Sequence, residues 1–252
     1  MNKNRINKTE EDNEKIHFNK MARDYDSNYK YFDEFTQYKI CKKITELTKL
    51  VDPTKDKIKL LDLGCGTGEY TKQIAEIFPN ANITGLDISE KIIRIAEKKC
   101  RKYKNVRFVV RSAYNTGFRD DYFDVVTGFY FLHHINIRKI AQEINRILKK
   151  KGKVFFYEPN IINPIVYLIK SSSFLKKIAG DSPDEWAINP LKIRRQLSPL
   201  SLSKMYSSEY IPPIPCISTK CKITLDKFSM PLSRFILTKY LGGSLLLFAV
   251  KR

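Results

Sequence analysis

The sequence has no apolar run long enough to cross a membrane and no cysteine pattern that suggests disulfide bonds. A membrane-spanning helix needs about 20 consecutive apolar residues, and no stretch of the 252 residues approaches that length. The first fifteen residues, MNKNRINKTEEDNEK, are polar and unlike a secretory signal. The five cysteines are scattered and odd in number, which argues against a disulfide framework. We therefore expect a globular cytoplasmic protein whose thiols stay reduced.

Acidic residues are also scarce, because 27 Asp and Glu oppose 46 Lys and Arg, for a net charge of +19. An excess of this size suits a nucleic acid or an anionic membrane as partner. The lysines are spread along the chain rather than gathered in one stripe, so a general bias in composition explains the charge equally well. Both interpretations stay open.

Short apolar strands alternate with helical patterns over the middle of the chain. Strand patterns occupy residues 60–63, 82–87, 106–110, 123–130 and 154–158, and another lies at residues 244–250. The alternation predicts an α/β fold whose parallel sheet is covered by helices on both faces. Residues 1–15 are charged and we expect them to be frayed. Residues 161–215 lose the rhythm and are rich in Pro and Ser.

Three of only ten glycines lie in one stretch, LLDLGCGTGEY, where a strand pattern passes into a helical one. Glycines at this point permit positive φ and let a ligand approach the backbone, while the helix N-terminus offers free amides. Asp87 follows the last of these glycines by nineteen residues and ends the second strand. A carboxylate there can accept hydrogen bonds from both hydroxyls of a ribose. The stretch therefore predicts a site for an adenosine-type cofactor.

The acid inside the motif indicates which cofactor this is. Asp62 precedes the first glycine by two positions. A carboxylate beside a pyrophosphate would be repulsive, whereas beside an ammonium or a sulfonium it is favourable. This sign argument favours S-adenosylmethionine over a nicotinamide dinucleotide.

Several motifs together resemble a known family. LDLGCGTG, GLDIS, FDVVTGFYFLHHI and ILKKKGKVFFYEPN look like the successive motifs of class I S-adenosylmethionine-dependent methyltransferases of the type 11-like group. The resemblance covers about residues 18–160. It implies a Rossmann-like, seven-stranded, mostly parallel sheet with an antiparallel last strand and a substrate-cap insertion before it. We accordingly divide the chain into an N-terminal segment and lid (1–36), a cofactor-binding core (37–160), a variable substrate region (161–243) and a terminal strand (244–252).

The resemblance also implies roles for individual positions. The methionine end of the cofactor would lie against Asp62 and the turn formed by Gly64, Cys65, Gly66 and Gly68, with Cys65 as filler. The ribose would bind Asp87, and the adenine would meet Ile88, Ser112 and Ala113. Phe129 is a further candidate for the cofactor site. Many members of the family carry Asp where Ser112 stands, and a serine accepts a hydrogen bond without the assistance of a charge.

Four residues near the strand ends are candidates for the chemistry. His133 and His134 follow the fourth strand, and a near-neutral imidazole suits removal of a proton from a hydroxyl acceptor. Of the two, His134 is the preferred base, although the pair could instead form a helix cap. Glu158 ends the fifth strand and could bind an acceptor, act as a base or anchor a turn. Tyr25 could close a lid over the cofactor or simply pack.

The variable region should select the acceptor. Residues 165–178 mix apolar side chains with lysines and could lie on an anionic membrane, or could form a lid helix with its lysines in water. The function most consistent with these features is O-methylation of a small-molecule, glycan or lipid-linked acceptor. The alternatives are an RNA methyltransferase and a non-catalytic binding member of the fold. We expect no metal site, because Cys216 and Cys221 have no histidine nearby. The sequence does not indicate an oligomeric state.

Overall fold

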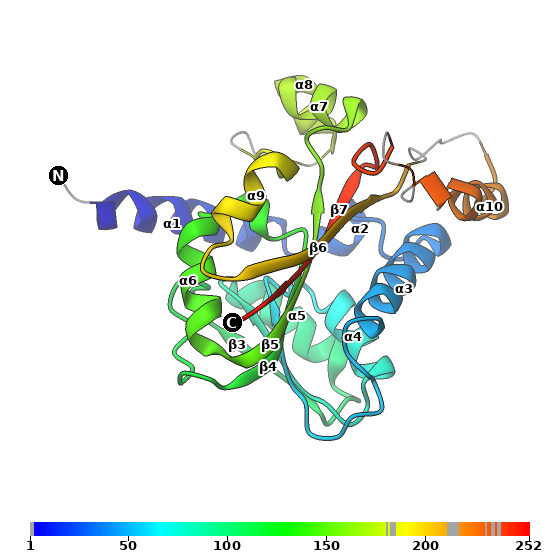
Figure 1. Ribbon diagram of the computed structural model, residues 1–252. Helices are drawn as coiled ribbons and strands as arrows, with labels where there is room; N and C mark the ends of the chain where they lie inside the picture. Colours follow the sequence, from blue (N-terminus) through cyan, green and yellow to red (C-terminus); the bar gives the residue numbers. More distant parts are fainter. Residues whose placement is uncertain are drawn as a thin grey trace.

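Figure 1 shows a computed structural model built around one central sheet. It describes residues 3–179, 181, 185–210, 217–229, 231–232, 235 and 238–252, and Cys216 lies outside them. The sheet has seven strands in the order β3-β2-β1-β4-β5-β7-β6. Its strands are β1 (Lys59–Leu63), β2 (Asn82–Asp87), β3 (Val106–Val110), β4 (Phe123–Phe129), β5 (Leu148–Pro159), β6 (Ser201–Ser208) and β7 (Ser244–Val250). The first five run parallel, and β7 is antiparallel to both its neighbours, so the predicted fold class is confirmed.

Helices cover both faces of the sheet because each presents one apolar stripe. On one face α3 (Glu34–Thr48) and α4 (Glu69–Ile77) pack against the strands. On the other face α6 (Ile137–Ile147) buries isoleucines at helical spacing, together with α9 (Pro190–Gln196). The helix α5 (Glu90–Cys100) begins at Ser89, whose hydroxyl accepts a hydrogen bond from the Ile92 amide at 3.3 Å. The two apolar layers fix the carboxyl ends of β1, β2 and β4 beside one another.

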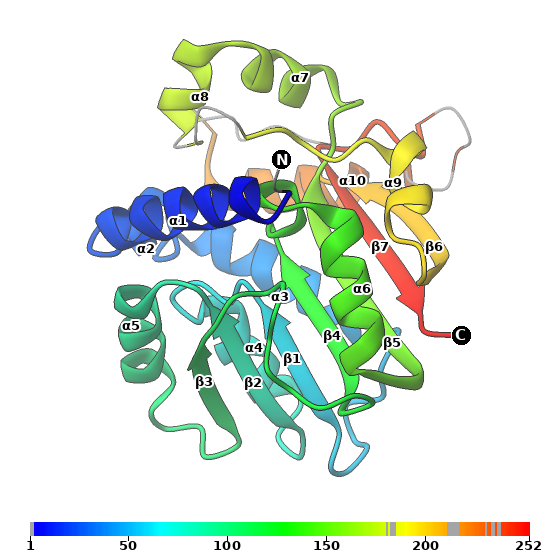
Figure 2. The ribbon, with the colours of Figure 1, turned by 90° about the vertical axis from the view of Figure 1, so that its left-hand side faces the viewer.

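The N-terminal segment is ordered, so the expectation of a frayed end was wrong. Residues Lys3–Met21 form α1, and Tyr25–Asn28 form the short helix α2. Figure 2 shows α1 crossing above the carboxyl ends of the central strands, with α7 and α8 beyond it. The sequence did not predict this helix because it is charged and has no strong apolar stripe. The helix is held instead by contacts with the core, since Asn19 Oδ1 accepts a hydrogen bond from Ser89 Oγ at 2.8 Å.

The region predicted to be a cap has two parts. The helices α7 (Pro164–Ser171), α8 (Ser173–Ala179) and α10 (Thr219–Ser229) lie outside the sheet, but β6 pairs with β7 along its length. The core sheet therefore draws a strand from residues 161–243, which the predicted boundaries did not anticipate. None of the described helices is long and apolar enough to span a membrane.

Candidate active site

The glycine turn lies where expected, between β1 and α4. Gly66 has a φ of +52°, and a Cβ at this position would lie 2.9 Å from the Tyr25 hydroxyl. Gly68 has a φ of +78°, and a Cβ there would lie 3.1 Å from the Ala96 side chain. Gly66 thus keeps the backbone open toward the site, while Gly68 allows α4 and α5 to pack closely. Cys65 is buried and its amide donates to the Leu86 carbonyl, which fits its predicted role as filler.

Asp62 is a buried carboxylate that, among the residues the structure describes, accepts its hydrogen bonds from hydroxyl groups. Its two oxygens accept hydrogen bonds from Thr71 Oγ1 at 2.6 Å and Thr127 Oγ1 at 3.4 Å. Burial raises the pKa of Asp62 to about 7, against the effect of these two hydrogen bonds. Asp62 lies beneath the turn rather than among the residues that line the cavity described below. A cationic group above the turn would stabilise its ionised form.

Asp87 connects the glycine turn to the start of α5. Its Oδ2 accepts a hydrogen bond from the Gly66 amide at 3.1 Å, and its Oδ1 accepts one from the Ser89 amide at 2.9 Å. Burial raises the pKa of Asp87, while these amide donors oppose the rise. The side chain lines the cavity beside Ile88, at the position where the fold seats a ribose.

The adenine edge contains an acid that the sequence did not point to. Ser112 Oγ donates a hydrogen bond to Glu11 Oε1, which comes from α1. Glu11 and Ala113 both line the cavity, whereas Ser112 does not. A carboxylate thus lies next to the position where many class I members carry Asp. No local signal could have revealed this, because 101 residues separate the two partners.

One cavity of about 370 Å³ joins the cofactor positions to the space beyond them. Gly64, Asp87 and Ile88 line one part of it. Aromatic side chains supply much of the remaining wall, and these are Phe18, Tyr25, Tyr29, Tyr31, Tyr114, Phe129, Tyr130 and Phe131. Aromatic lining of this kind is typical of a pocket that binds a largely apolar ligand.

Tyr25 belongs to the cofactor side of this cavity. Its ring lies against Gly66, and α2 is held to the turn by Asp26, which accepts a hydrogen bond from Thr67 Oγ1 at 2.5 Å. Burial raises the pKa of Tyr25 well above its ordinary value. The phenol therefore stays protonated near neutral pH, which suits a hydrogen-bond donor.

Glu158 organises the histidine pair. The two histidines lie on a single 3-10 turn, η1 (Leu132–His134), that follows β4. Glu158 is fully buried, and its Oε1 accepts hydrogen bonds from the amides of Phe131 and Leu132 at 2.9 and 2.7 Å. Its Oε2 lies 2.7 Å from His133 Nδ1. Of the roles considered for Glu158, these contacts support the turn anchor and leave it no oxygen that faces an acceptor.

The two histidines have opposite protonation preferences. Burial alone would lower the pKa of His133, but hydrogen bonds to Glu158 and Glu185 outweigh it and raise the pKa to about 9. Burial, reinforced by the charge of His133, lowers the pKa of His134 to about 3. At pH 7 His133 is therefore an imidazolium and His134 is neutral. Both line the cavity.

The variable region adds three charged residues that sequence reasoning missed. Lys170 on α7 forms ion pairs with Glu185 and, at 2.7 Å, with Asp181, and all three line the cavity. Lys170 and Lys176 are buried, whereas Tyr167 and Leu168 are more than half exposed. The segment thus covers the cavity with Lys170 inward, and of its lysines only Lys177 is exposed. The only prior signal was the acidic DSPDEWA stretch that contains Asp181 and Glu185.

The fold and the cofactor positions together define a class of protein. Residues 61–156 match the family model described as a methyltransferase domain. The sheet order and the antiparallel β7 are those of class I S-adenosylmethionine-dependent methyltransferases. This part of the chain is therefore similar to a methyltransferase domain, and the cofactor of that class is S-adenosylmethionine.

Particular relatives are similar over part of the chain. The demethylmenaquinone methyltransferase of Thermotoga maritima is 34% identical over 142 residues, which are 56% of this chain and 59% of the relative. The enzyme of the same name from Chlorobaculum parvum is 37% identical over 127 residues, or 48% of this chain and 51% of the relative. The chain thus spans little more than half the length of these relatives. A solved S-adenosylmethionine-dependent methyltransferase from Thermotoga maritima shares the fold, with a TM-score of 0.68 and 13% identity over 94% of this chain and 99% of that chain.

Proposed function

We propose that the protein transfers a methyl group from S-adenosylmethionine to a small, flat, mostly apolar acceptor that carries a hydroxyl group. The observation that carries this proposal is the histidine pair, one charged and one neutral, in the wall of an aromatic cavity that also contains the cofactor positions. S-adenosylmethionine supplies an activated methyl group on a sulfonium. The protein's own contribution is then to hold both molecules in line and to exclude water.

The residues of the cofactor site fit S-adenosylmethionine. Asp87 has both oxygens fixed by backbone amides and lines the cavity where the ribose hydroxyls would lie. Asp62 is a buried carboxylate without a cationic partner among its hydrogen-bond donors, as expected for a group beneath the methionine ammonium. Glu11 takes the place of the Asp common in the family and would accept a hydrogen bond from the adenine amino group.

The acceptor's oxygen would lie against the histidine pair. Both nitrogens of the His133 imidazolium face carboxylates, of Glu158 and Glu185, so it would act on a nearby hydroxyl only through its charge, which favours the nucleophilic anionic form. His134 is neutral at pH 7 and can accept a hydrogen bond from that hydroxyl, but a group with this pKa is a weak base. We therefore assign His134 the orientation of the acceptor and His133 the stabilisation of its charge. Glu158 positions His133.

Two methyl acceptors are compatible with this arrangement. The sequence favours transfer to the oxygen itself. The curated relatives named demethylmenaquinone methyltransferase favour a ring carbon, which an ionised hydroxyl on the same aromatic ring would activate. A lipid-linked aromatic ring fits the apolar cavity in either case.

The experiment is a methyl-transfer assay on the purified chain. The protein is incubated with labelled S-adenosylmethionine and, in separate reactions, a catechol, a naphthoquinol, a glycolipid fraction and bulk tRNA. We expect label in the catechol or naphthoquinol, with mass and NMR spectra distinguishing O-methyl from C-methyl products. The Asp87→Ala variant should lose most of this transfer. Label confined to tRNA, or no binding of S-adenosylmethionine, would overturn the proposal.

A further inference from the structure

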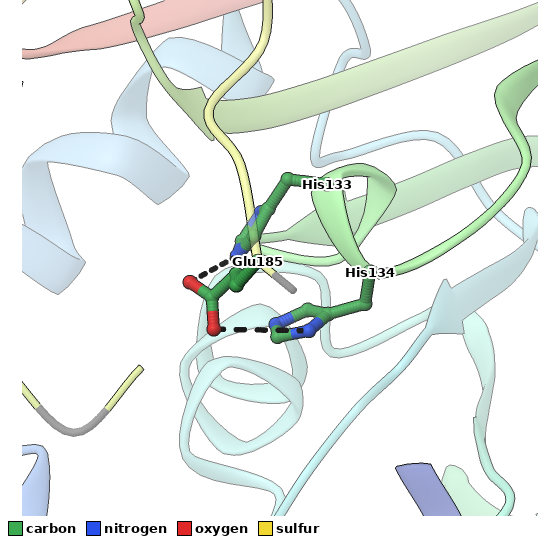
Figure 3. Close-up of side chains that lie close together, drawn as sticks. All are labelled: His133, His134 and Glu185. Carbon is green, nitrogen blue, oxygen red and sulfur yellow. Dashed lines mark ion pairs between the residues drawn. The ribbon is translucent and has the colours of Figure 1, made fainter. Parts of the chain in front are cut away.

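His133, His134 and Glu185 bring three metal-ligating side chains to one point of the cavity wall. Figure 3 shows both imidazoles facing the same carboxylate, each toward a different oxygen. His133 Nε2 lies 3.2 Å from Glu185 Oε1, and His134 Nδ1 lies 4.0 Å from Glu185 Oε2. One ligand atom from each residue lies within 4.8 Å of the other two. Ligand atoms of a tetrahedral ion at about 2.0–2.1 Å lie about 3.4 Å apart, so His133 and Glu185 already have the required spacing and His134 would have to move inward.

The surroundings of the cluster resemble those of a built metal centre. Glu158 Oε2 lies 2.7 Å from His133 Nδ1, which leaves Nε2 directed at Glu185. A carboxylate that fixes the outer nitrogen of a ligating histidine is a usual feature of metal sites, because it orients the ring and makes the ligand more basic. Backbone amides of Phe131 and Leu132 in turn hold Glu158. Glu158 and the backbone amides therefore hold the His133 ring in a fixed orientation.

His134 supplies a second, independent observation. Its Nδ1 is buried and makes no hydrogen bond within the described part of the chain, although Glu14 Oε2 lies 3.4 Å from it. A buried polar atom normally has a partner, and leaving it without one costs roughly 1–3 kcal/mol. Phe18 packs against the ring with centroids 5.6 Å apart and excludes water from that side. A metal ion would satisfy this nitrogen.

The charge balance also favours a cation. Four carboxylates lie around the pair, and these are Glu14, Glu158, Asp181 and Glu185. Lys170 is paired with two of them, Asp181 and Glu185. Apart from the two histidines, the cluster thus holds more carboxylates than lysines paired with them. A divalent ion would offset that excess.

We propose that His133, His134 and Glu185 bind one divalent transition-metal ion of the zinc type, with its remaining coordination positions open to the cavity. Two imidazoles and one carboxylate are the ligand set of ions such as Zn²⁺ and Co²⁺, and are unlike the all-oxygen set preferred by Mg²⁺. Three protein ligands with an open position are typical of a catalytic and not a structural site. With the ion bound, His133 is a neutral ligand, and the ion would take over its role by coordinating and stabilising a hydroxyl oxygen of the acceptor. This last step rests on the proposed function, whereas the binding of the ion does not.

The test is a metal titration without cofactor or acceptor, so its result does not depend on methyl transfer. Chelator-treated protein is titrated with Co²⁺, and the visible absorption of the bound ion is followed. We expect one Co²⁺ per chain, displaced by Zn²⁺, and at least a tenfold weaker affinity in His133→Ala, His134→Ala and Glu185→Gln. The matched control is His17→Ala, which removes the remaining histidine of the chain and should leave the affinity unchanged.

Folding of each variant is checked by its binding of S-adenosylmethionine. If a ligand variant fails that check, Glu158→Gln gives a second route, because loss of an outer-shell partner should weaken metal affinity about 10–100-fold while the three ligands remain. Absence of stoichiometric binding in the wild type would overturn the proposal. So would an equal loss of affinity in His17→Ala, since the ion would then bind elsewhere.

Discussion

His133 and Glu158 form a buried pair, with Nδ1 and Oε2 2.7 Å apart and both side chains almost inaccessible to solvent. The pair joins the turn after β4 to the carboxyl end of β5. Because Glu158 also accepts the amides of Phe131 and Leu132, a single carboxylate fixes both the backbone and the ring of the residue that faces the acceptor space. Glu158 therefore contributes both to the geometry of the cavity wall and to the stability of the fold.

Replacement of this carboxylate should destabilise the protein. In Glu158→Gln the amide oxygen can accept from the backbone, but the charge that balances His133 is lost. We expect the free energy of unfolding to fall by about 1–3 kcal/mol, as for other buried charged hydrogen bonds. Urea denaturation measures this change. Glu97→Gln is the control, because Glu97 is exposed on α5 and should change stability by less than about 0.5 kcal/mol. A similar loss in both variants would contradict the anchoring role.

The raised pKa of His133 also predicts how stability depends on pH. Since its pKa is about 9 in the folded protein and 6.5 ordinarily, its interactions stabilise the fold fully below pH 6.5. That contribution is lost as the pH rises from 6.5 through 9. We expect the difference in unfolding free energy between wild type and His133→Asn to be largest near pH 6 and to shrink toward pH 9.5. Urea denaturation of both proteins over this range tests it, and a difference that does not vary with pH would refute the assignment.

The lowered pKa of His134 acts in the opposite direction. Its neutral form is favoured in the folded protein, so its contribution is present above pH 6.5 and is lost as the pH falls toward 3. The difference in unfolding free energy between wild type and His134→Gln should therefore shrink as the pH falls from 6.5 toward 3. Because the two histidines respond in different pH windows, the same set of urea titrations separates them.

Local patterns in the sequence predicted the parts of the fold that bury apolar side chains close together in the chain. β1, β2 and β4 are short apolar runs, and α6 repeats isoleucine at helical spacing, so their positions follow from the sequence alone. β6 was not predicted, because SLSKMYSS is mostly polar and forms a strand only by pairing with β7 about forty residues later. The helix α1 was missed for a similar reason, since its contacts lie with distant residues.

The candidate site divides in the same way. The glycine turn and Asp87 carry local signals, because their backbone geometry is set by the strand-to-helix junctions. Glu11 carries none, and Glu185 carries only that of its acidic stretch, since each reaches the cavity far along the chain from its partner. The role of Glu158 could not be chosen from sequence, because the amides that it accepts belong to another strand exit.

Asp62 offers a test of the argument about charge. Its raised pKa of about 7 means that its ionised form is disfavoured by burial, so it destabilises the free protein progressively as the pH rises from 3.8 to 7. We expect Asp62→Asn to be more stable than wild type at pH 8 and to bind S-adenosylmethionine more weakly. Thermal unfolding and calorimetry measure the two effects. Unchanged cofactor affinity would show that Asp62 does not act on the methionine ammonium.

Asp87 should contribute directly to cofactor affinity. Asp87→Ala removes the carboxylate predicted to bind the ribose and the acceptor of the Gly66 amide. We expect binding of S-adenosylmethionine to weaken by about 1–3 kcal/mol, measured by calorimetry. Glu97→Ala removes an exposed acid and should leave the dissociation constant unchanged. Equal affinities in Asp87→Ala and wild type would place the ribose elsewhere.

Glu11 should replace the acid that many class I members carry where Ser112 stands. Its carboxylate accepts a hydrogen bond from Ser112 and lines the cavity. We therefore expect Glu11→Ala to weaken binding of S-adenosylmethionine by about 1.5–3 kcal/mol, which is the usual contribution of a hydrogen bond to a charged group. Asp12→Ala is the matched control, since it removes an exposed acid from the next position of the same helix. The decisive variant is Glu11→Ala combined with Ser112→Asp, which returns a carboxylate to the adenine edge from β3 and not from α1. Because only the origin of the charge differs, recovery of affinity in the double variant would show that α1 provides adenine recognition as well as a cover. If the double variant binds S-adenosylmethionine as weakly as Glu11→Ala does, Glu11 serves only to dock α1.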